Sequence, residues 1–337
     1  MNVHLAVPDL VWPDRETRAA ADPGRLAALE TLIARGRRRL APATDLESWL
    51  LAAWRTEGAA PHSLAADGGD PGDAYWLRAD PCSLRVDRDR VVPLDAAMFD
   101  LDREEAAALV ERLNRHFADR GFEFYPVQPE RWYLRLDSPT AHAADALATA
   151  RGRPIAVDPG SGAEAARWAA LGNEIQMLLH EHPVNEAREV RGELPINAVW
   201  LWGGGRFAAP PVRPFRRVRS GDPLAAGLAL GSGAAVLPMP DDAERWLRAS
   251  SNEGVELLVL DGLRASASYG EIERWREQLA VLERDWFAPL AEALARGRIG
   301  MLTVHAIGAG GTLDVETTRQ DLRYFWRRRR PLASYAQ

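Results

Sequence analysis

Four short apolar runs, each leading to a polar residue or glycine, constrain the fold of this chain more than any other feature of its sequence. The runs and the residues to which they lead are VHLAV (3–7) and Asp9, AVWLW (198–202) and Gly203, ELLVL (256–260) and Asp261, and GMLTV (300–304) and His305. Helical patterns follow them, which is the alternation expected of an α/β sheet with helices on its faces. Ligands of such sheets gather outside the carboxyl ends of the strands, so we expect these four segments to converge on one site.

Apolar residues at helical spacing predict four helices, at about 25–40, 102–117, 164–181 and 271–296. Gly36 should mark the end of the first helix, and Asp102 with Glu105 should cap the second. Pro183 should stop the third helix, and Pro289 should break or kink the fourth.

The pattern changes between about residues 75 and 137, where short strands flank one capped helix and no long crossover helix is present. A stretch rich in Gly, Pro, Ala and Asp, EGAAPHSLAADGGDPGD (57–73), indicates a flexible entry to this part of the chain. We therefore predict a discontinuous core domain, 1–70 and 163–337, that carries an inserted α+β domain at 73–162.

The overall composition is that of an ordinary globular protein. The chain has 337 residues, of which 47% are hydrophobic and 27% charged. No run approaches the roughly 20 apolar residues that span a bilayer, and the start MNVHLAVPDLVWPD does not read as a signal peptide, so we expect a cytoplasmic protein with no membrane partner. The formal net charge of −6 argues against a general nucleic-acid binder, so we expect no nucleic acid partner.

Two residue types exclude further classes of chemistry. All 42 basic residues are arginines, which excludes a lysine Schiff base, pyridoxal phosphate attachment and a P-loop lysine. Cys82 is the only cysteine, so the chain can form neither an internal disulfide nor a multi-cysteine metal site.

Three local motifs each allow a functional and a structural interpretation. In the HEH triplet, His180 and His182 point about 200° apart on a helix, so capping is favoured over metal binding. The glycines at 203–205 allow either close approach to a phosphate or tight packing. The run WRRRR (326–330) could bind an acidic partner, but a solvated helix face is the favoured interpretation.

A polar segment, PVNEAREVRGELPIN (183–197), lies between a predicted helix and a core strand and carries Asn185, Arg188 and Asn197. Arginine suits bidentate recognition of phosphate or carboxylate, so this segment predicts an anion site. The chain has no GxSxG elbow, no HExxH and no paired-cysteine motif, and the residues alone therefore lead only to an α/β protein with an anion site.

The segment HPVNEAREVRGELPINAVWLWGGG (182–205) resembles a motif of the archaeal-type, cofactor-independent phosphoglycerate mutases, HPxNxxRxxxGxxPxNxIWxWGxG. The segments WLRADPCSLRVDRDRVVPLD (76–95) and ERWYLRL (130–136) are also similar to that family, as is the order of the amino-terminal segments. The resemblance covers nearly the whole chain but thins after residue 215, and it is closest to a bacterial branch often labelled RpfE-type regulatory protein. It implies an alkaline phosphatase-like core, with a mixed, mainly parallel sheet flanked by helices, and an inserted α+β domain.

That superfamily uses two divalent metal ions and a Ser or Thr nucleophile for phosphoryl transfer. By resemblance, Asp9 matches the opening aspartate of the metal site, and Thr44, followed by Asp45, matches the nucleophile most nearly. Asp261 matches the aspartate of an Asp-Glu-x-x-His segment, but no histidine follows it in GLRASASYG. His305 keeps the histidine of an Asp-His pair whose aspartate is replaced by valine, no histidine follows it, and the catalytic lysine is missing.

Three remnant ligands, Asp9, Asp261 and His305, could hold a single divalent ion (Mn, Zn or Mg), but not two in the family's way. Capping of helices and turns is the structural alternative for these residues. No cofactor is otherwise expected. The resemblance also implies that the anion-binding residues are kept, and the full set is Arg78, Arg131, Asn185, Arg188 and Asn197.

The resulting expectation is a non-catalytic or weakly active phosphoglycerate mutase-like protein that binds a phosphorylated metabolite or an unknown protein in a regulatory role. One alternative is an active mutase or phosphomonoesterase that uses a rearranged site with Thr44 as nucleophile. The other alternative is a protein-interaction module that keeps only the fold.

Overall fold

The chain folds into two compact units. The computed structural model describes residues 1–87, 90–140, 144–153, 163–250 and 253–335. The first unit is made of Met1–Arg55 and Pro210–Gln337, and the second is Thr56–Ala209. No helix in the described part of the chain is long and apolar enough to cross a membrane.

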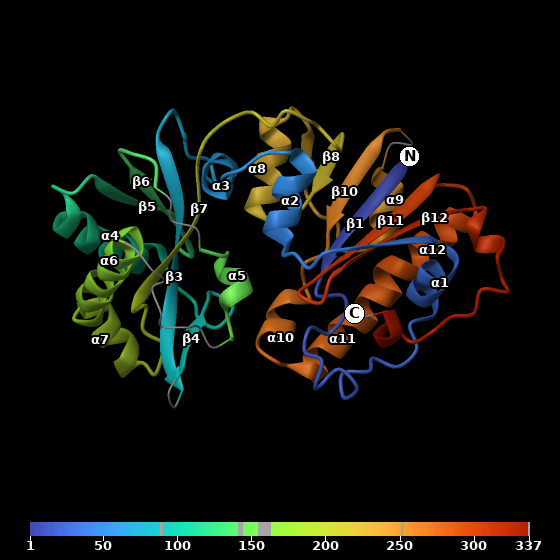
Figure 1. Ribbon diagram of the computed structural model, residues 1–337, viewed down its shortest axis with the longest axis horizontal. Helices are drawn as coiled ribbons and strands as arrows, with labels where there is room; N and C mark the ends of the chain where they lie inside the picture. Colours follow the sequence, from blue (N-terminus) through green and yellow to red (C-terminus); the bar gives the residue numbers. More distant parts are fainter. Residues whose placement is uncertain (88–89, 141–143, 154–162, 251–252, 336–337) are drawn as a thin grey trace. The chain divides into compact units, whose positions relative to one another are not determined.

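A seven-stranded mixed sheet forms the centre of the first unit (Figure 1). Its strands, in spatial order, are β2 (Arg37–Ala41), β12 (Thr312–Thr318), β11 (Met301–Ile307), β1 (Asn2–Pro8), β10 (Val255–Val259), β8 (Arg217–Arg219) and β9 (Ala235–Leu237). The five strands from β11 to β9 are parallel, whereas β12 and β2 run antiparallel to their neighbours. The predicted α/β class with a mainly parallel sheet is therefore confirmed.

Helices cover both faces of this sheet. The helical elements are α1 (Ala27–Arg35), α2 (Leu46–Trp54), α8 (Pro223–Gly231), α9 (Ala243–Ala249), α10 (Arg264–Ser268), α11 (Ile272–Leu282), η1 (Glu283–Phe287), α12 (Ala288–Ala295), η2 (Asp321–Arg323) and η3 (Leu332–Tyr335). One apolar face packs against α1, α11 and α12 through residues such as Leu32, Leu279 and Leu290. On the opposite face, the side chain of Trp49 in α2 contacts the ring of His305 in β11.

Two of the helices predicted in this unit differ from the observed elements in instructive ways. Helix α1 ends before Gly36, as predicted, but the arginines that follow form strand β2 instead of continuing the helix. A Cβ on Gly36 would lie 2.4 Å from Thr317 Oγ1, so the chain turns into the sheet where only glycine fits. The long helix at 271–296 is interrupted by a π-helical turn, η1, just before Pro289, which confirms the predicted break.

The second unit is built on a five-stranded antiparallel sheet. Its strands are β3 (Tyr75–Asp87), β4 (Arg90–Leu94), β5 (Phe122–Gln128), β6 (Arg131–Leu136) and β7 (Ala198–Arg206). The order is β4-β3-β6-β5, and β7 pairs with the long central strand β3 as well.

The described part of this unit has five helices: α3 (Ala59–Ala66), α4 (Arg103–Phe117), α5 (Leu147–Ala150), α6 (Ala163–His180) and α7 (Pro183–Val190). The Asp102 side chain caps α4 by accepting from the amide of Glu105, as predicted. His182 caps α7 through its ring nitrogen, which accepts from the amide of Val184 at 3.2 Å. His182 therefore caps a helix, but at the amino end of α7 and not at the carboxyl end of the preceding helix, where the sequence interpretation placed it.

The boundaries of this unit differ from those predicted. The prediction placed 163–337 in the core domain, but α6, α7 and β7 all belong to the second unit. Strand β7 is the predicted strand AVWLW, and it pairs with β3 from Cys82↔Ala198 to Tyr75↔Arg206. The strand AVWLW was expected to share one sheet with the other three apolar runs, and this was wrong, because β7 is hydrogen-bonded to β3 in the second sheet.

The three glycines in β7 allow the strand to pack closely against its neighbours. A Cβ added to Gly203 would lie 2.9 Å from the Ala59 side chain, and one added to Gly205 would lie 2.6 Å from the Cα of Gly58. A Cβ added to Gly204 would lie 2.6 Å from the hydroxyl oxygen of Tyr75. Tight packing against α3 and β3 therefore accounts for the glycine run.

This packing predicts that Gly205→Ala destabilises the chain by about 2 kcal/mol or more, because the new methyl group meets backbone that cannot move aside. Gly172→Ala is the matched control, since that glycine lies in α6 with open space around its Cα. In the control, alanine should stabilise the helix by up to about 1 kcal/mol. Urea unfolding of both variants measures the difference, and equal midpoints would contradict the packing argument.

Candidate functional site

The carboxyl end of β1 holds the first candidate residue, Asp9. Its backbone is in the left-handed region, with φ 55°, which is uncommon for a residue other than glycine. Two hydrogen bonds hold it there: its amide donates to the carbonyl of Ile307 at 2.8 Å, and the indole of Trp275 donates to its carbonyl at 2.9 Å. The local backbone thus fixes where the Asp9 side chain begins.

A buried ion pair lies close to this edge. Arg264, the first residue of α10, places one guanidinium nitrogen 2.9 Å from each carboxylate oxygen of Glu47 in α2. The two side chains are only 11% and 8% exposed. Because water barely reaches this pair, removal of one partner would leave the other charge buried and uncompensated, which costs far more than at the surface.

Three further carboxylates act on this pair electrostatically. Burial by itself would lower the pKa of Arg264, but the negative charges of Glu47, Asp222 and Asp9 outweigh it and raise that pKa. Burial raises the pKa of Glu47, and Asp222 and Asp45 add to the rise, whereas Arg264 opposes it. We call Arg264 with Asp9, Asp45, Glu47 and Asp222 the Arg264 cluster.

The elements of the first unit bring this cluster together. Asp45 and Asp222 are the N-caps of α2 and α8 and accept from the amides of Ser48 and Ala225. Asp9 follows β1, and Arg264 follows β10, which is the strand next to β1. The carboxyl edge of the parallel strands therefore gathers charged residues, but of the residues predicted to meet there, Asp9, Gly203, Asp261 and His305, only Asp9 is a member of this cluster.

The cluster does not fit the two-metal centre that the resemblance implies. A guanidinium keeps its proton throughout the accessible pH range and supplies only donors, so it cannot ligate a cation. Here that fixed positive charge is already bound to Glu47 and compensates the acidic side chains. Within the described residues, no group of three or more His, Cys, Asp or Glu side chains is placed to hold a metal ion.

His305 lies inside β11, which continues to Ile307, so the prediction that it follows the strand was wrong. Its Nδ1 is 2.7 Å from Asp314 Oδ1, and its Nε2 is 2.9 Å from Nδ1 of His4. Arg39 extends the row by donating to Asp314 at 2.7 Å. Both ring nitrogens of His305 are thus engaged, and a metal role for Asp9, Asp261 and His305 stays a prediction.

The row also shifts the titration of His4. Burial and, to a lesser degree, the neighbouring His305 lower its pKa to about 4, although Asp314 acts in the opposite direction. His4 is therefore neutral at physiological pH. At the other end of the row, Asp314 and Arg39 form an ion pair in which their charges compensate each other.

The candidate nucleophile, Thr44, lies immediately before the N-cap of α2. Its hydroxyl donates to the carbonyl oxygen of Asp45 at 3.3 Å. A hydroxyl at a helix N-terminus lies where an anion is favoured, but the Arg264 cluster surrounds that helix start with carboxylates. The nucleophilic role of Thr44 stays a prediction.

Two of the predicted anion-binding arginines already bind carboxylates of the second unit. Arg78 is buried and donates twice to Asp80, at 3.0 and 2.6 Å, and its guanidinium also lies over the rings of Tyr133 and Trp202. Arg131 binds both oxygens of Asp67, at 3.0 and 2.9 Å. An added anion would have to replace these internal partners.

The other three predicted residues organise the backbone around α7. The buried amide of Asn185 bonds to backbone groups of Leu179 and Ile196, and Asn197 pairs with both backbone groups of Leu84. Arg188 is 1% exposed and donates to Glu105, Leu194 and Asp100. These contacts explain the polar segment 183–197 structurally, and a ligand role for Asn185, Arg188 and Asn197 stays a prediction.

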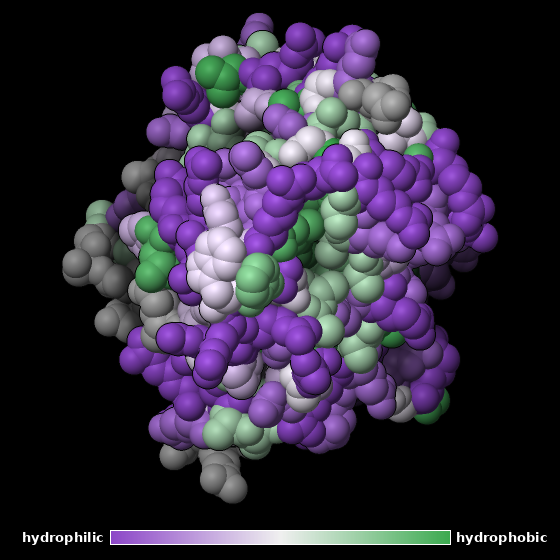
Figure 2. All heavy atoms as spheres, turned by 90° about the vertical axis from the view of Figure 1, so that its right-hand side faces the viewer, coloured by the Kyte–Doolittle hydropathy of each residue, from purple (hydrophilic) through white to green (hydrophobic). Residues whose placement is uncertain are grey.

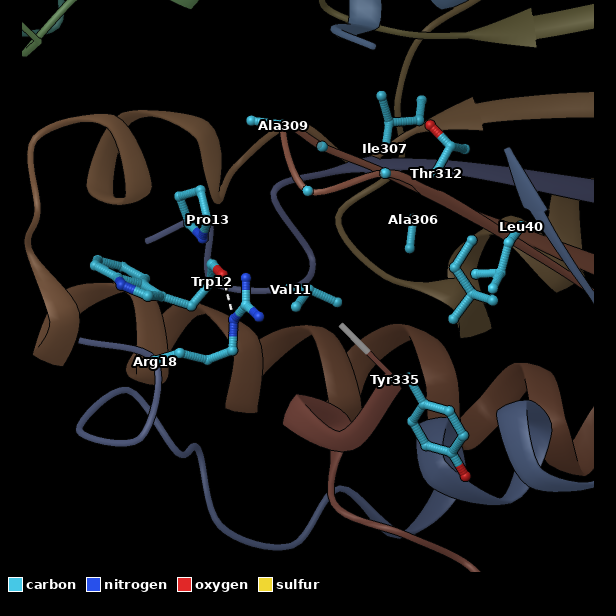
Figure 3. A pocket seen from close by; sticks show the side chains of 14 residues that line it. Val11, Trp12, Pro13, Arg18, Leu40, Ala306, Ile307, Ala309, Thr312 and Tyr335 are labelled. Atoms are coloured by element: carbon cyan, nitrogen blue, oxygen red, sulfur yellow. Dashed lines mark hydrogen bonds between the residues drawn. The ribbon is translucent and has the colours of Figure 1, made fainter. Parts of the chain in front are cut away.

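A small cavity opens beside the carboxyl ends of β1 and β11 (Figure 3). The loop from Gly308 to Gly311 lines one side, and Trp12 and Arg18 line another, with Arg18 donating to the carbonyl of Trp12 at 3.2 Å. Its volume is about 30 Å³, which is room for water molecules and not for a metabolite.

Comparisons with known proteins relate the chain to phosphoglycerate mutases. A 2,3-bisphosphoglycerate-independent phosphoglycerate mutase of Methanosarcina barkeri is 30% identical over 122 residues, which are 35% of this chain and 30% of the relative. A probable enzyme of the same name from Geobacter sulfurreducens is 26% identical over 220 residues, 62% of this chain and 53% of the relative. The chain thus spans about half or less of the length of these curated relatives. No family model matches the chain.

Solved structures share the fold. A cofactor-independent phosphoglycerate mutase from Thermoplasma acidophilum superposes with a TM-score of 0.51 at 17% identity, covering 99% of this chain and 94% of that one. A protein from Pyrococcus horikoshii gives a TM-score of 0.57 at 13% identity, covering 94% and 87%. The fold is therefore of the alkaline phosphatase type. Taken with the sequence relatives, the chain is a phosphoglycerate mutase-like protein.

Sequence reasoning missed the residues at the centre of the Arg264 cluster. The segment GLRASASYG was noted only for its missing histidine, although it contains an arginine three positions after Asp261. A charged residue among small and apolar ones, just after a buried strand, is a usable signal, because such a side chain needs a buried partner. The identity of that partner, Glu47, could not be read from the sequence.

The first prediction from this site concerns pH. His4 has an unfolded pKa of 6.5 and a folded pKa of about 4, so the folded state binds fewer protons between these values and stability falls as the pH falls. At pH 5 this group should cost about 2 kcal/mol relative to pH 7.5. His4→Leu should remove that part of the pH dependence in urea unfolding, and an unchanged slope would contradict the assignment.

The second prediction concerns the buried ion pair. Arg264→Met should cost about 3–5 kcal/mol at pH 8, because it leaves the Glu47 carboxylate buried without its partner. The loss should shrink at pH 5, where the unpaired Glu47 binds a proton, and Glu47→Gln added to Arg264→Met should recover part of the stability.

Arg248→Met is the matched control for this pair. Arg248 and Glu244 are 72% and 68% exposed, so breaking their ion pair should cost less than about 1 kcal/mol. If the two arginine variants unfold alike at pH 8, the Arg264 pair has no special role in stability.

Proposed function

We propose that this phosphoglycerate mutase-like protein has a degenerate catalytic site, is non-catalytic or weakly active, and acts as a phospho-ligand-binding or regulatory protein. The observation that carries the proposal is the ion pair of Arg264 and Glu47, which three further carboxylates influence electrostatically. The relatives named phosphoglycerate mutases are different proteins, and their activity relates to this chain only through the sequence similarity described above.

The physical argument rests on charge. Two divalent ions in phosphoryl transfer stabilise both the attacking and the leaving oxygens. The Arg264 cluster instead combines one guanidinium with the carboxylates Asp9, Asp45, Glu47 and Asp222. A guanidinium donates hydrogen bonds but is no Lewis acid, so it cannot replace the divalent ions in this chemistry.

The direct test is an assay of phosphoglycerate mutase activity with the full chain, with and without added Mn²⁺ or Zn²⁺, and with metal content measured by elemental analysis. We expect no turnover above the protein-free control and less than two bound ions per chain. Mutase turnover accompanied by two stoichiometric ions would overturn the proposal.

The second candidate function is that of an active mutase or phosphomonoesterase with a rearranged site. It rests on Thr44, whose hydroxyl lies directly before the N-terminus of α2. If Thr44 were the nucleophile of a rearranged mutase or phosphomonoesterase site, Thr44→Ala would abolish turnover and Thr44→Ser would retain it. We expect instead that any residual phosphatase activity is the same in both variants.

A further inference from the structure

The arginine run near the carboxyl end lies in an irregular segment, not on the helix face that the sequence favoured. It follows η2, and residues 327–330 have neither helical nor strand structure. The segment from Tyr324 to Arg330, here called the aromatic-arginine segment, reads YFWRRRR. The segment belongs to the first unit.

Phe325 and Arg327–Arg330 of this segment form one wall of an open cavity of about 510 Å³. The opposite wall comes from the amino-terminal part of the chain, through Arg25 and Arg35 together with Asp22 and Glu30. Six arginines in all line the cavity: Arg25, Arg35, Arg327, Arg328, Arg329 and Arg330. The lining therefore carries six positive charges against two negative ones.

None of these six arginines forms an ion pair with a carboxylate of the described residues. Arg327 and Arg35 donate to carbonyl oxygens, of Arg35 and Leu322 respectively, and the Nε of Arg35 is buried without a partner. On some helices, by contrast, exposed arginines such as Arg115 and Arg245 pair with a carboxylate one helical turn away. This cavity is thus a concentration of uncompensated guanidinium groups.

Aromatic rings accompany the charge. Phe325 and Trp326 are 77% and 63% exposed, and they are the only exposed aromatic side chains in the described ranges. Tyr324 lies beneath them, with the Trp326 ring at 5.2 Å and the Arg327 guanidinium at 4.8 Å from its ring. Figure 2 views the side of the molecule that carries this segment, where hydrophobic spheres stand among hydrophilic ones.

We propose that the cavity and the aromatic-arginine segment form a binding site for single-stranded nucleic acid. The guanidinium groups bind successive phosphates, because their planar donor geometry matches phosphate oxygens. The faces of Phe325 and Trp326 stack on unpaired bases, which gives affinity with little sequence preference. A single strand supplies both groups at once, whereas a duplex hides the faces of its bases.

Other polyanions match the site less well. An acidic peptide satisfies the arginines but leaves the two exposed rings without planar partners. An anionic membrane favours aromatic side chains that project from a convex surface, whereas here the arginines and Phe325 line a hollow. These ligands are therefore competing outcomes of the test.

The net charge of −6 does not oppose this site. At physiological ionic strength, charges more than about 8 Å apart are largely screened, so a phosphate in the cavity responds to the arginines around it and not to the whole chain. The sequence expectation of no nucleic acid partner used a whole-chain average, which carries no information on such a local field.

The test measures fluorescence anisotropy of a labelled 12-nucleotide oligothymidylate and oligouridylate with the full chain, over a range of salt concentrations. We expect binding that weakens with salt. The variant Arg328→Ala/Arg329→Ala/Arg330→Ala should bind at least tenfold more weakly, with a salt slope smaller by about 2, since three phosphate contacts are lost.

The variant Phe325→Ala/Trp326→Ala should also bind about tenfold more weakly, but with an unchanged salt slope, because stacking and not charge is removed. The control is Arg245→Ala/Arg248→Ala, which removes two exposed, paired arginines of α9 and should leave binding unchanged. Circular dichroism melting of each variant checks that the fold is kept.

Several outcomes would overturn the proposal. These are an absence of oligonucleotide binding by the unaltered chain, equal affinity in all variants, or tighter binding to the duplex than to the single strand. Binding to phosphatidylserine vesicles, to polyglutamate or to ATP, with none to the oligonucleotides, would assign the site to another ligand. The result is independent of the mutase assay, because the Arg264 cluster contributes nothing to this cavity.

Discussion

The ion pair between Arg264 and Glu47 is the interaction on which the carboxyl edge of the first sheet depends. Four acidic side chains gather there, and the buried carboxylate of Glu47 is costly unless a positive charge compensates it. In a metal-dependent phosphotransferase divalent ions supply such compensation. In this chain the permanently charged Arg264 is bound to Glu47 and supplies part of it.

Internal ion pairs also engage the predicted anion-binding arginines of the second unit. Arg78, Arg131 and Arg188 pair with carboxylates of the same unit, which are those of Asp80, Asp67 and Glu105 respectively. A buried guanidinium that is already paired stabilises the fold and offers little to an outside anion. The cavity that Arg327–Arg330 line instead gathers six arginines that pair with no carboxylate of the described residues, and the sequence had favoured a solvated helix face for this run.

Much of the fold could be predicted from the sequence because its signals are local. The apolar face of α4, the cap at Asp102 and the break before Pro289 each depend on residues close by in the chain. The failures have one cause. Strand β7 reads as a core strand, and the arginines after Gly36 read as helix, because pairing with β3 and with β12 is decided by residues far away in the chain.

By itself, the sequence determined the α/β class, the apolar strands of the first sheet and the resemblance to phosphoglycerate mutases, since periodicity and motif spacing are properties of the chain. It also placed Asp9 and Asp261 after buried strands. Only the tertiary structure decided which charges meet, namely Arg264 with Glu47 and His305 with Asp314 and His4. The physical reason is that the energy of a charge depends on its burial and on its neighbours in space, which sequence separation does not encode.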